Sequence, residues 1–338
     1  MIMSRTIYLI LLIILVNNVT SSEASDFGAF INRISQTTTK IKNHLVEFFY
    51  RFRSFFARHS ESTHHSMTAR GCGYAVDDEP TIYQKQGNII AKIKGGDDAI
   101  WHTWPWMVAI FTNPRKGWSC AGVLVNEDTI LTAAHCLLHT KANEIKAIIG
   151  VHTILGKLNP LNYYSVKSIH RHPQFEDCCK NDIAVIKLTK SILYGPKINA
   201  VCLPISPHLS IEDEGDLVNR TGVIIGWGDS SKNGLTNMIK SFTLQQADIR
   251  IFDNEYCRQA YDSIFDPKTE ICAGDYDRRT DTMSGDSGGP LLIRQSDGRW
   301  IVLGITSYGS ATSPQVAPGV YAKLSAYTQW LEPFLKSK

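Results

Sequence analysis

Gly285-Asp286-Ser287-Gly288-Gly289-Pro290 is the stretch that decides the fold of this 338-residue chain, because it surrounds one serine with the groups that nucleophilic chemistry requires. A serine hydroxyl is a poor nucleophile at neutral pH, so it needs a nearby base and backbone donors that hold the oxyanion it creates. The glycines on both sides of Ser287 allow sharp backbone turns and bring N–H groups close to a bound carbonyl. The hexapeptide therefore predicts a reactive serine.

Two upstream segments contain the partners that a reactive serine needs. Leu131-Thr132-Ala133-Ala134-His135-Cys136 contains an imidazole, and Asn181-Asp182, followed by the apolar run 183–188, contains a carboxylate. The order His, Asp, Ser resembles that of the chymotrypsin/trypsin family of serine proteases. The resemblance covers residues 93–338 and includes, in the family's order, Pro105-Trp106, Gly226-Trp227-Gly228, Ser307-Tyr308-Gly309 and Pro318-Gly319-Val320-Tyr321.

The fold that this resemblance implies is all-β, with two six-stranded antiparallel barrels (chymotrypsin-like) and a C-terminal helix. Short β-rich runs separated by Gly, Pro and Asn turns agree with it, among them 106–112, 119–125, 129–132 and 300–308. Residues 326–335 place four large apolar side chains at helical spacing, which predicts a terminal helix docked by its apolar face.

The resemblance also assigns chemical roles to the three segments. His135 is expected to be the general base that takes the proton from Ser287 and later gives it to the leaving amine. Asp182 is expected to accept a hydrogen bond from the other ring nitrogen and to fix the tautomer. The backbone N–H groups of Gly285 and Ser287 resemble the oxyanion hole.

Substrate binding is expected along Ser307-Tyr308-Gly309, which resembles the edge segment that pairs with a substrate backbone. Gly309 and Gly319 match the positions where bulky side chains would block entry to the primary pocket. Asp281 stands six residues before Ser287, where trypsin-like relatives carry a carboxylate at the pocket floor. That position predicts a preference for Arg or Lys.

A second interpretation of Asp281 remains open. Asp275, Asp277 and Asp281 lie close together in the sequence, which is also typical of an acidic surface stretch, but the ungapped spacing from Asp281 to Ser287 favours the pocket.

The sequence around Ile93 predicts storage as a zymogen. Ile93-Lys94-Gly95-Gly96 resembles the new N-terminus of an activated protease, which implies cleavage after Lys92. The freed ammonium group of Ile93 would pair with Asp286 and order the oxyanion loop. A cut after Lys94 would instead produce a new N-terminus at Gly95, which has no apolar side chain to anchor it, so we expect that cut to inactivate the protease.

The first 92 residues divide into two predicted regions. Residues 1–22 contain the apolar run 7–16, which is too short for a membrane span and predicts a signal peptide and a secreted protein. Residues 23–92 form the predicted prosegment, in which 41–56 has the pattern of a basic amphipathic helix. Such a helix either packs on a protein or lies on an anionic membrane.

Eight cysteines in a secreted chain predict disulfides. The resemblance implies the pairs Cys72–Cys202, Cys120–Cys136 and Cys257–Cys272, the first of which would tether the prosegment. Two further bridges of the family are missing as pairs, because Gly222 and Ile293 occupy one pair of positions and Met283 and Thr312 the other. For Cys178 and Cys179 the sequence favours a vicinal disulfide or a bridge local to their loop, and a bridge to another chain is the alternative.

Charge and motifs exclude several classes of function. The chain has a formal net charge of +3, and residues 93–338 contain 25 Lys and Arg against 25 Asp and Glu, which gives no electrostatic case for nucleic acid. No zinc or calcium motif is present, so we expect neither a metal nor a cofactor. Asn219-Arg220-Thr221 is an N-glycosylation sequon.

The sequence as a whole predicts a secreted serine endopeptidase that cuts after Arg or Lys. Its expected partners are protein or peptide substrates and an activating protease, with a protein inhibitor as a further possible partner. The alternative is a protease homologue with weak or no activity that acts as a binding or regulatory protein. All three residues of the predicted triad are present, which favours the enzyme.

Overall fold

The computed structural model describes most of the region in which the sequence predicts a protease domain. The described residues are 71–75, 97–112, 120–154, 160–176, 180–204, 217–228, 242–275, 285–309 and 317–336. Several predictions lie outside them, namely those for the signal peptide, the helix at 41–56, Lys92, Ile93, Asp281, Met283, Thr312, Cys178 and Cys179. No helix within the described residues has the length and apolar character needed to cross a membrane.

The first half of the described chain forms a closed six-stranded antiparallel barrel, in the order β2-β3-β4-β7-β6-β5. Its strands are β2 (Met107–Phe111), β3 (Cys120–Asn126), β4 (Thr129–Thr132), β5 (Lys146–Ile149), β6 (Tyr163–Arg171) and β7 (Ala184–Leu188). All four residues of β4 are buried, as are the inner residues of β2 and β3, because these strands are rich in Val, Ile, Leu and Ala.

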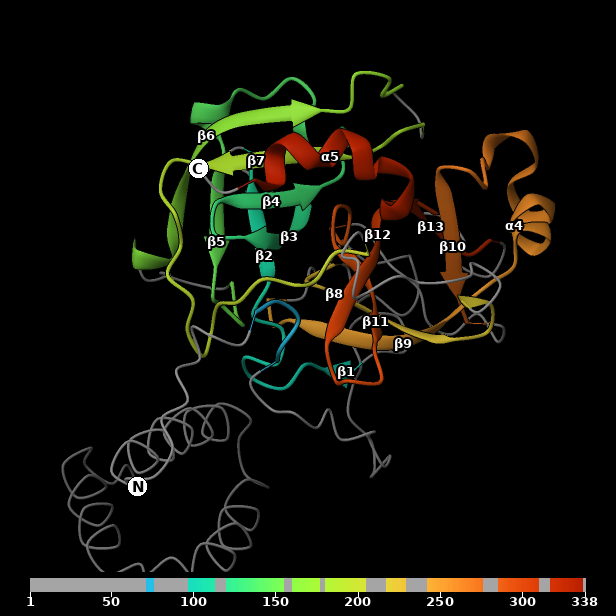
Figure 1. Ribbon diagram of the computed structural model, residues 1–338, viewed down its shortest axis with the longest axis horizontal. Helices are drawn as coiled ribbons and strands as arrows, with labels where there is room; N and C mark the ends of the chain where they lie inside the picture. Colours follow the sequence, from blue (N-terminus) through green and yellow to red (C-terminus); the bar gives the residue numbers. More distant parts are fainter. Residues whose placement is uncertain are drawn as a thin grey trace, which may run out of the picture. The chain divides into compact units, whose positions relative to one another are not determined.

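The second half forms another antiparallel barrel. Its strands are β8 (Thr221–Gly226), β9 (Gln245–Ile251), β10 (Glu270–Gly274), β11 (Pro290–Arg294), β12 (Trp300–Tyr308) and β13 (Gly319–Lys323). The order β9-β10-β13-β12-β11-β8 closes into a ring because β8 pairs with β9 as well as with β11, and the short strand β1 (Asp97–Asp98) is added to β9. The prediction of two six-stranded antiparallel barrels is confirmed. Figure 1 shows the first barrel in teal and green and the second in yellow to red.

Within the described residues, two α-helices accompany the barrels. The sequence analysis did not predict α4 (Asn254–Tyr261), which begins because the Asp253 carboxylate accepts a hydrogen bond from Tyr256 N at 2.7 Å. The predicted C-terminal helix is present as α5 (Thr328–Leu335). It follows a 3₁₀ turn, η7 (Leu324–Tyr327), so the α-helix begins two residues later than predicted. The described part of the chain also contains the 3₁₀ turns η2 (His135–Leu137), η3 (Ala142–Glu144), η4 (Pro160–Asn162) and η6 (Asp262–Ile264).

Helix α5 follows the second barrel in the sequence but packs on the first (Figure 1). The Lys187 ammonium group of β7 donates to the Phe334 carbonyl at 3.0 Å and to Thr129 Oγ1 at 2.7 Å, and it forms an ion pair with Asp128. This C-terminal helix therefore joins the two barrels and holds them in one unit.

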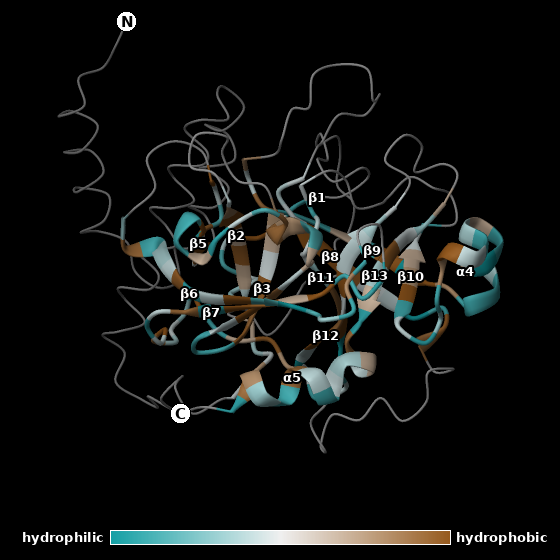
Figure 2. Cartoon of the chain, turned by 90° about the horizontal axis from the view of Figure 1, so that it is seen from above, coloured by the Kyte–Doolittle hydropathy of each residue, from teal (hydrophilic) through white to brown (hydrophobic). Residues whose placement is uncertain are grey.

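The hydrophobic core runs through both barrels and the region where they meet. Trp106 and Trp227, one from each half, are both fully buried in the larger apolar cluster. Figure 2 shows brown, hydrophobic residues gathered along the strands, whereas α4 is mainly teal. Because side chains fill both barrels, polar groups with chemical roles are expected on the loops that connect the strands.

The structure contains the three disulfides that the family resemblance implies, namely Cys72–Cys202, Cys120–Cys136 and Cys257–Cys272. It also explains one missing pair. Strands β8 and β11 pair Ile224 with Leu291 and Val223 with Leu292, so the same register places Gly222 opposite Ile293. Ile293 is fully buried, and apolar packing occupies this place in the second barrel.

Candidate active site

His135 and Asp182 approach each other from two loops of the first barrel. His135 begins η2, which two alanines separate from β4, and Asp182 lies just before β7. The Nδ1 atom of His135 lies 2.7 Å from Asp182 Oδ2, and the backbone N–H of His135 donates to Asp182 Oδ1 at 2.9 Å. One carboxylate therefore fixes both the ring and the main chain of the histidine. About a third of the His135 side chain remains exposed.

The turn at Asn181 directs Asp182 inward. Asn181 has a φ of 52°, a left-handed conformation that Asn adopts more readily than most residues. Its carbonyl accepts from Ile183 N at 2.8 Å, and its side-chain amide donates to Gln174 O at 3.0 Å. The predicted carboxylate is thus held by a tight turn at the start of β7.

Ser307 is the third partner of Asp182, and the sequence analysis did not assign it this role. Its hydroxyl donates to Asp182 Oδ2 at 2.6 Å from strand β12 of the second barrel. The pairing of β12 with β13 shifts register between Thr306 and Tyr308, so Ser307 is the extra residue of a β-bulge. The contact joins residues 125 apart, and no local sequence pattern indicates it.

The surroundings of Asp182 favour its ionised form. Burial by itself would raise the pKa of this carboxyl group, which is only 3% exposed. The hydrogen bond and the charge of His135, followed by the hydroxyl of Ser307 and the backbone N–H of His135, outweigh burial and lower the pKa. Asp182 is therefore a carboxylate at neutral pH, ready to stabilise a protonated His135.

The Ser287 loop enters the same region from the second barrel. The Ser287 carbonyl accepts from Ala121 N of β3 at 2.8 Å, and Gly288 N donates to Thr306 O at 2.8 Å. Gly288 has a φ of +81°, and a Cβ atom there would lie 2.2 Å from Thr132 Oγ1. Only glycine fits at this position, so the loop is fixed against both barrels.

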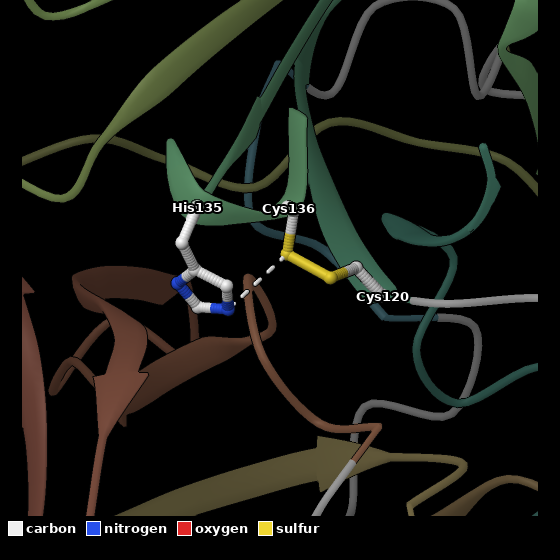
Figure 3. Close-up of side chains that lie close together, drawn as sticks. All are labelled: Cys120, His135 and Cys136. Carbon is white, nitrogen blue, oxygen red and sulfur yellow. Dashed lines mark hydrogen bonds between the residues drawn. A yellow bond between two sulfur atoms is a disulfide. The ribbon is translucent and has the colours of Figure 1, made fainter. Parts of the chain in front are cut away.

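The structure brings Ser287 and His135 to one region but does not join their side chains. Among the described residues, no hydrogen bond links Ser287 Oγ to His135 Nε2. The Nε2 atom lies 3.7 Å from Cys136 Sγ, the contact drawn as a dashed line in Figure 3. Catalytic hydrogen bonds often tighten only when a substrate is bound.

Cys120, His135 and Cys136 form a compact group whose possible metal-ligating atoms all lie within 4.8 Å of one another. Figure 3 shows, however, that the two sulfur atoms are bonded to each other. A disulfide has no thiolate to offer a metal ion. The Cys136 Sγ atom also lies 3.7 Å from the Ser287 carbonyl oxygen, so this bridge supports both His135 and the Ser287 loop.

Comparison with known proteins identifies the family. The family model described as trypsin matches residues 93–331. The chain belongs to the trypsin family. A curated relative, the clotting factor G beta subunit of Tachypleus tridentatus, is 33% identical over 259 residues, which cover 72% of this chain and 80% of the relative. The proclotting enzyme of the same organism is 29% identical over 265 residues, covering 75% of this chain and 68% of the relative.

A solved trypsin-family structure agrees with the fold. Neuropsin, described as a serine protease expressed in the limbic system of mouse brain, is 30% identical, with a TM-score of 0.59. The match covers 72% of this chain and 99% of neuropsin. The chain is therefore a serine protease homologue with a segment that the neuropsin match does not cover.

Asp286 occupies an internal cradle of this trypsin-family domain. Its carboxylate Oδ1 accepts from Gly228 N at 2.8 Å, and the residue is 2% exposed. Cβ atoms built at Gly226 and Gly228 would lie 1.9 Å from Oδ1 and 2.4 Å from Oδ2. Both glycines of the Gly226-Trp227-Gly228 segment are therefore required for the carboxylate to fit.

The two glycines assigned to the walls of the primary pocket face each other. A Cβ atom at Gly309 would lie 3.6 Å from the Cα atom of Gly319. Gly309 is exposed and Gly319 is buried. Asp281, assigned to the floor of the pocket, lies outside the described residues.

Proposed function

We propose that this protein is a secreted trypsin-like serine endopeptidase that hydrolyses peptide bonds after Arg or Lys. The observation that carries the proposal is the 2.7 Å contact between His135 Nδ1 and a buried, ionised Asp182, beside the Ser287 loop. An imidazole held through Nδ1 in this way presents Nε2 as a base.

The proposed reaction uses the three residues in turn. His135 accepts the Ser287 proton as Oγ attacks the scissile carbonyl, and Asp182 stabilises the imidazolium that results. The backbone N–H groups of Gly285 and Ser287 hold the oxyanion. His135 then gives its proton to the leaving amine, and water releases the acyl group from Ser287 by the same steps.

Specificity for Arg or Lys rests on Asp281. Gly309 and Gly319 have no side chains, so neither residue obstructs the proposed slot. A carboxylate at the end of such a slot selects a cationic side chain, since an unpaired buried charge is costly. If Asp281→Ser leaves the preference for Arg and Lys unchanged, this assignment is wrong.

Activation is proposed to follow cleavage after Lys92, with the new ammonium group of Ile93 pairing with Asp286. Asp98 of β1 and Gly226 of β8 both pair with Gln245 of β9, which separates them by two strand spacings, about 10 Å. The chain from Ile93 to Asp98 spans up to about 17 Å when extended. Ile93 can therefore reach the cradle of Asp286 next to Gly226.

The Cys72–Cys202 bridge supports a prosegment that stays attached after cleavage. Cleavage after Lys92 would separate residues 1–92 from the rest of the chain, and the bridge would keep them covalently bound. Disulfides are typical of proteins in oxidising compartments, which supports secretion. Asn219 is exposed, so its sequon is accessible for the proposed glycan.

The test is the cleavage of a mixed peptide library by protein that has been cut after Lys92, with products read by mass spectrometry. We expect product C-termini of Arg and Lys, an active chain that starts Ile93-Lys94-Gly95-Gly96, and no products from the Ser287→Ala variant. Absence of any cleavage by correctly cut protein would favour the alternative of an inactive homologue with a binding role. A preference for another residue would leave a protease but overturn the assignment of Asp281.

A further inference from the structure

Glu270 is a second buried carboxyl group beside the candidate active site, and neither the triad nor the primary pocket uses it. It opens β10 and is only 3% exposed. Its Oε2 atom accepts from Asp266 N at 2.8 Å and from the hydroxyl of Tyr308 at 3.1 Å. Its Oε1 atom is buried and has no hydrogen-bond partner among the described residues.

Tyr308 connects this carboxyl group to the catalytic region. It directly follows Ser307, whose hydroxyl holds Asp182. The end of β12 is thus anchored at two consecutive residues, by Ser307 to Asp182 and by Tyr308 to Glu270. The Tyr308 ring also packs edge-on against Tyr261, with ring centres 5.3 Å apart.

Near Ser287, the two edges of β12 follow different described neighbours. Strand β11 pairs with β12 only from Pro290 opposite Ile305 onward, whereas β13 continues along the other edge to Tyr308. Beyond Thr306, the described neighbour on the first edge is the Ser287 loop, through Gly288 N and Thr306 O. This placement beside the Ser287 loop agrees with the expectation from the sequence that an extended substrate adds to β12 along Ser307-Tyr308-Gly309.

We propose that Glu270 is a positioning residue: its ionised carboxylate holds the Tyr308 hydroxyl and so fixes the end of β12 for substrate residues that precede the scissile bond. This inference rests on the proposed function. It adds a determinant of binding for extended substrates and leaves the roles of His135, Asp182 and Ser287 unchanged.

Three neighbouring groups, Asp266, Tyr308 and Lys180, influence the pKa of Glu270, and the titratable side chains Tyr327 and Lys323 belong to elements close to it. Burial is the largest effect and raises its pKa to about 7, and the nearby Asp266 charge acts in the same direction. The hydrogen bonds from Asp266 N and Tyr308 and the charge of Lys180 oppose this rise. On η7, burial and the charges of Glu270, Asp182 and Asp266 raise the pKa of Tyr327, which keeps that hydroxyl neutral. The Lys323 ammonium group of β13 donates to the carbonyl of Pro267, the residue after Asp266, at 2.7 Å.

The Tyr308 hydrogen bond determines whether extended substrates bind better at low or at high pH. Because this bond lowers the pKa of Glu270, it is stronger to the carboxylate than to the carboxylic acid. Glu270 is protonated below about pH 7 and ionised above it. Tyr308 is therefore held more firmly above pH 7, and we expect a higher kcat/KM for extended substrates there.

The experiment compares two substrates over pH 5.5–9 with protein cut after Lys92. One is N-acetyl-arginine 4-nitroanilide, which ends before Tyr308, and the other is an acetylated tetrapeptide 4-nitroanilide with arginine at the cleaved bond. The ratio of their kcat/KM values cancels every effect of pH that is common to both substrates. We expect this ratio to rise about fivefold with a midpoint near pH 7, the size that separates a neutral from a charge-assisted hydrogen bond.

Two variants and a control make the result specific. Glu270→Gln keeps the shape and one acceptor oxygen but cannot ionise, so the ratio should stay at its low acidic value at every pH. Tyr308→Phe removes only the hydroxyl and should give the same flat profile, while Glu255→Gln, on the exposed surface of α4, should keep the step. A step that survives in both test variants, or a flat profile in the unmodified protein, would overturn the inference. Failure to hydrolyse the short substrate would overturn the proposed function instead.

Discussion

Asp182 and Glu270 are two buried carboxyl groups held by adjacent residues of one strand, yet their surroundings tune them in opposite directions. Asp182 receives three hydrogen bonds, from the ring and backbone of His135 and from Ser307, and its pKa is lowered. Glu270 receives two hydrogen bonds on one oxygen, its other oxygen has no partner among the described residues, and its pKa is raised to about 7. Burial is similar at both sites, so the number and charge of the partners decide the protonation state.

This difference indicates that the two carboxyl groups have different roles. A carboxylate that must stabilise a protonated histidine has to remain ionised throughout the working range of pH. A carboxyl group that titrates near neutrality instead responds to pH, and its effect passes through Tyr308 rather than through His135. The predictions below test each side of this comparison.

The largest effect is expected at Asp182. Asp182→Asn keeps the shape but removes the charge that stabilises the imidazolium, and it favours the wrong tautomer of His135. We expect kcat/KM on an arginine substrate to fall by about 10⁴, the scale known for this substitution in serine proteases with the same triad. Asp297→Asn, a carboxylate-to-amide change at an exposed position, serves as the control and should leave kcat/KM unchanged. A loss of less than tenfold at Asp182 would contradict the assignment.

A smaller effect is expected at Ser307. Ser307→Ala removes one of the hydrogen bonds that lower the Asp182 pKa, so that pKa should rise. Because a folded-state pKa below the ordinary value contributes stability that is lost as pH falls, the variant should lose activity and stability at a higher pH on the acid side. We expect kcat/KM at pH 7 to fall about tenfold, as for the loss of one hydrogen bond to a charged group. An unchanged acid limb in the pH profile would show that the Ser307 contact has no influence on Asp182.

The contribution of Glu270 to folding stability should depend on pH in the opposite direction to that of Asp182. Its folded-state pKa of about 7 lies above its ordinary value of 4.5, so its contribution is present below pH 4.5 and is lost as pH rises through 7. Glu270→Gln removes this loss. Its Tm should be close to that of the unmodified protein below pH 4.5 and should exceed it at pH 8 by about 10 °C, because a pKa raised from 4.5 to about 7 corresponds to about 3 kcal/mol. A Tm difference that is constant with pH would contradict the assignment.

The smallest effect is expected from Tyr308→Phe. The Tyr308 hydrogen bond lowers the Glu270 pKa, so its removal should raise that pKa further. Carbon-13 NMR of side-chain-labelled glutamate, with the Glu270 signal assigned from the Glu270→Gln variant, should show a titration midpoint above that of the unmodified protein. A midpoint that stays in place would mean that the bond is equally strong to both forms.

Much of the fold was predictable because its signals are local. The runs at 129–132 and 300–308 match β4 and β12, and the apolar spacing at the end of the chain predicted α5. Helix α4 was missed although Asp253 is a typical N-cap, since its first turn shows no apolar periodicity. The resemblance to a known family predicted how the two barrels close, which no local pattern could establish.

The site was predictable only in part, for the same reason. His135, Asp182 and Ser287 lie in recognisable segments, whereas Ser307 bonds to a residue 125 positions away and is aimed there by a bulge. Glu270 looks like an ordinary polar residue at the start of a strand. Its burial and its raised pKa arise from groups distant in the sequence, including Tyr308, 38 positions away, so composition and spacing give no sign of it.

The most direct measurement is an active-site titration of the protein after cleavage behind Lys92. A guanidinobenzoate ester that releases a fluorophore on acylation reports whether Ser287 attacks a carbonyl and whether the pocket accepts a cationic group. The account predicts a burst of close to one fluorophore per cut chain, no burst from the uncut chain, and none from Ser287→Ala. A cut and folded chain that gives no burst would contradict the claim that His135, Asp182 and Ser287 form a working catalytic site.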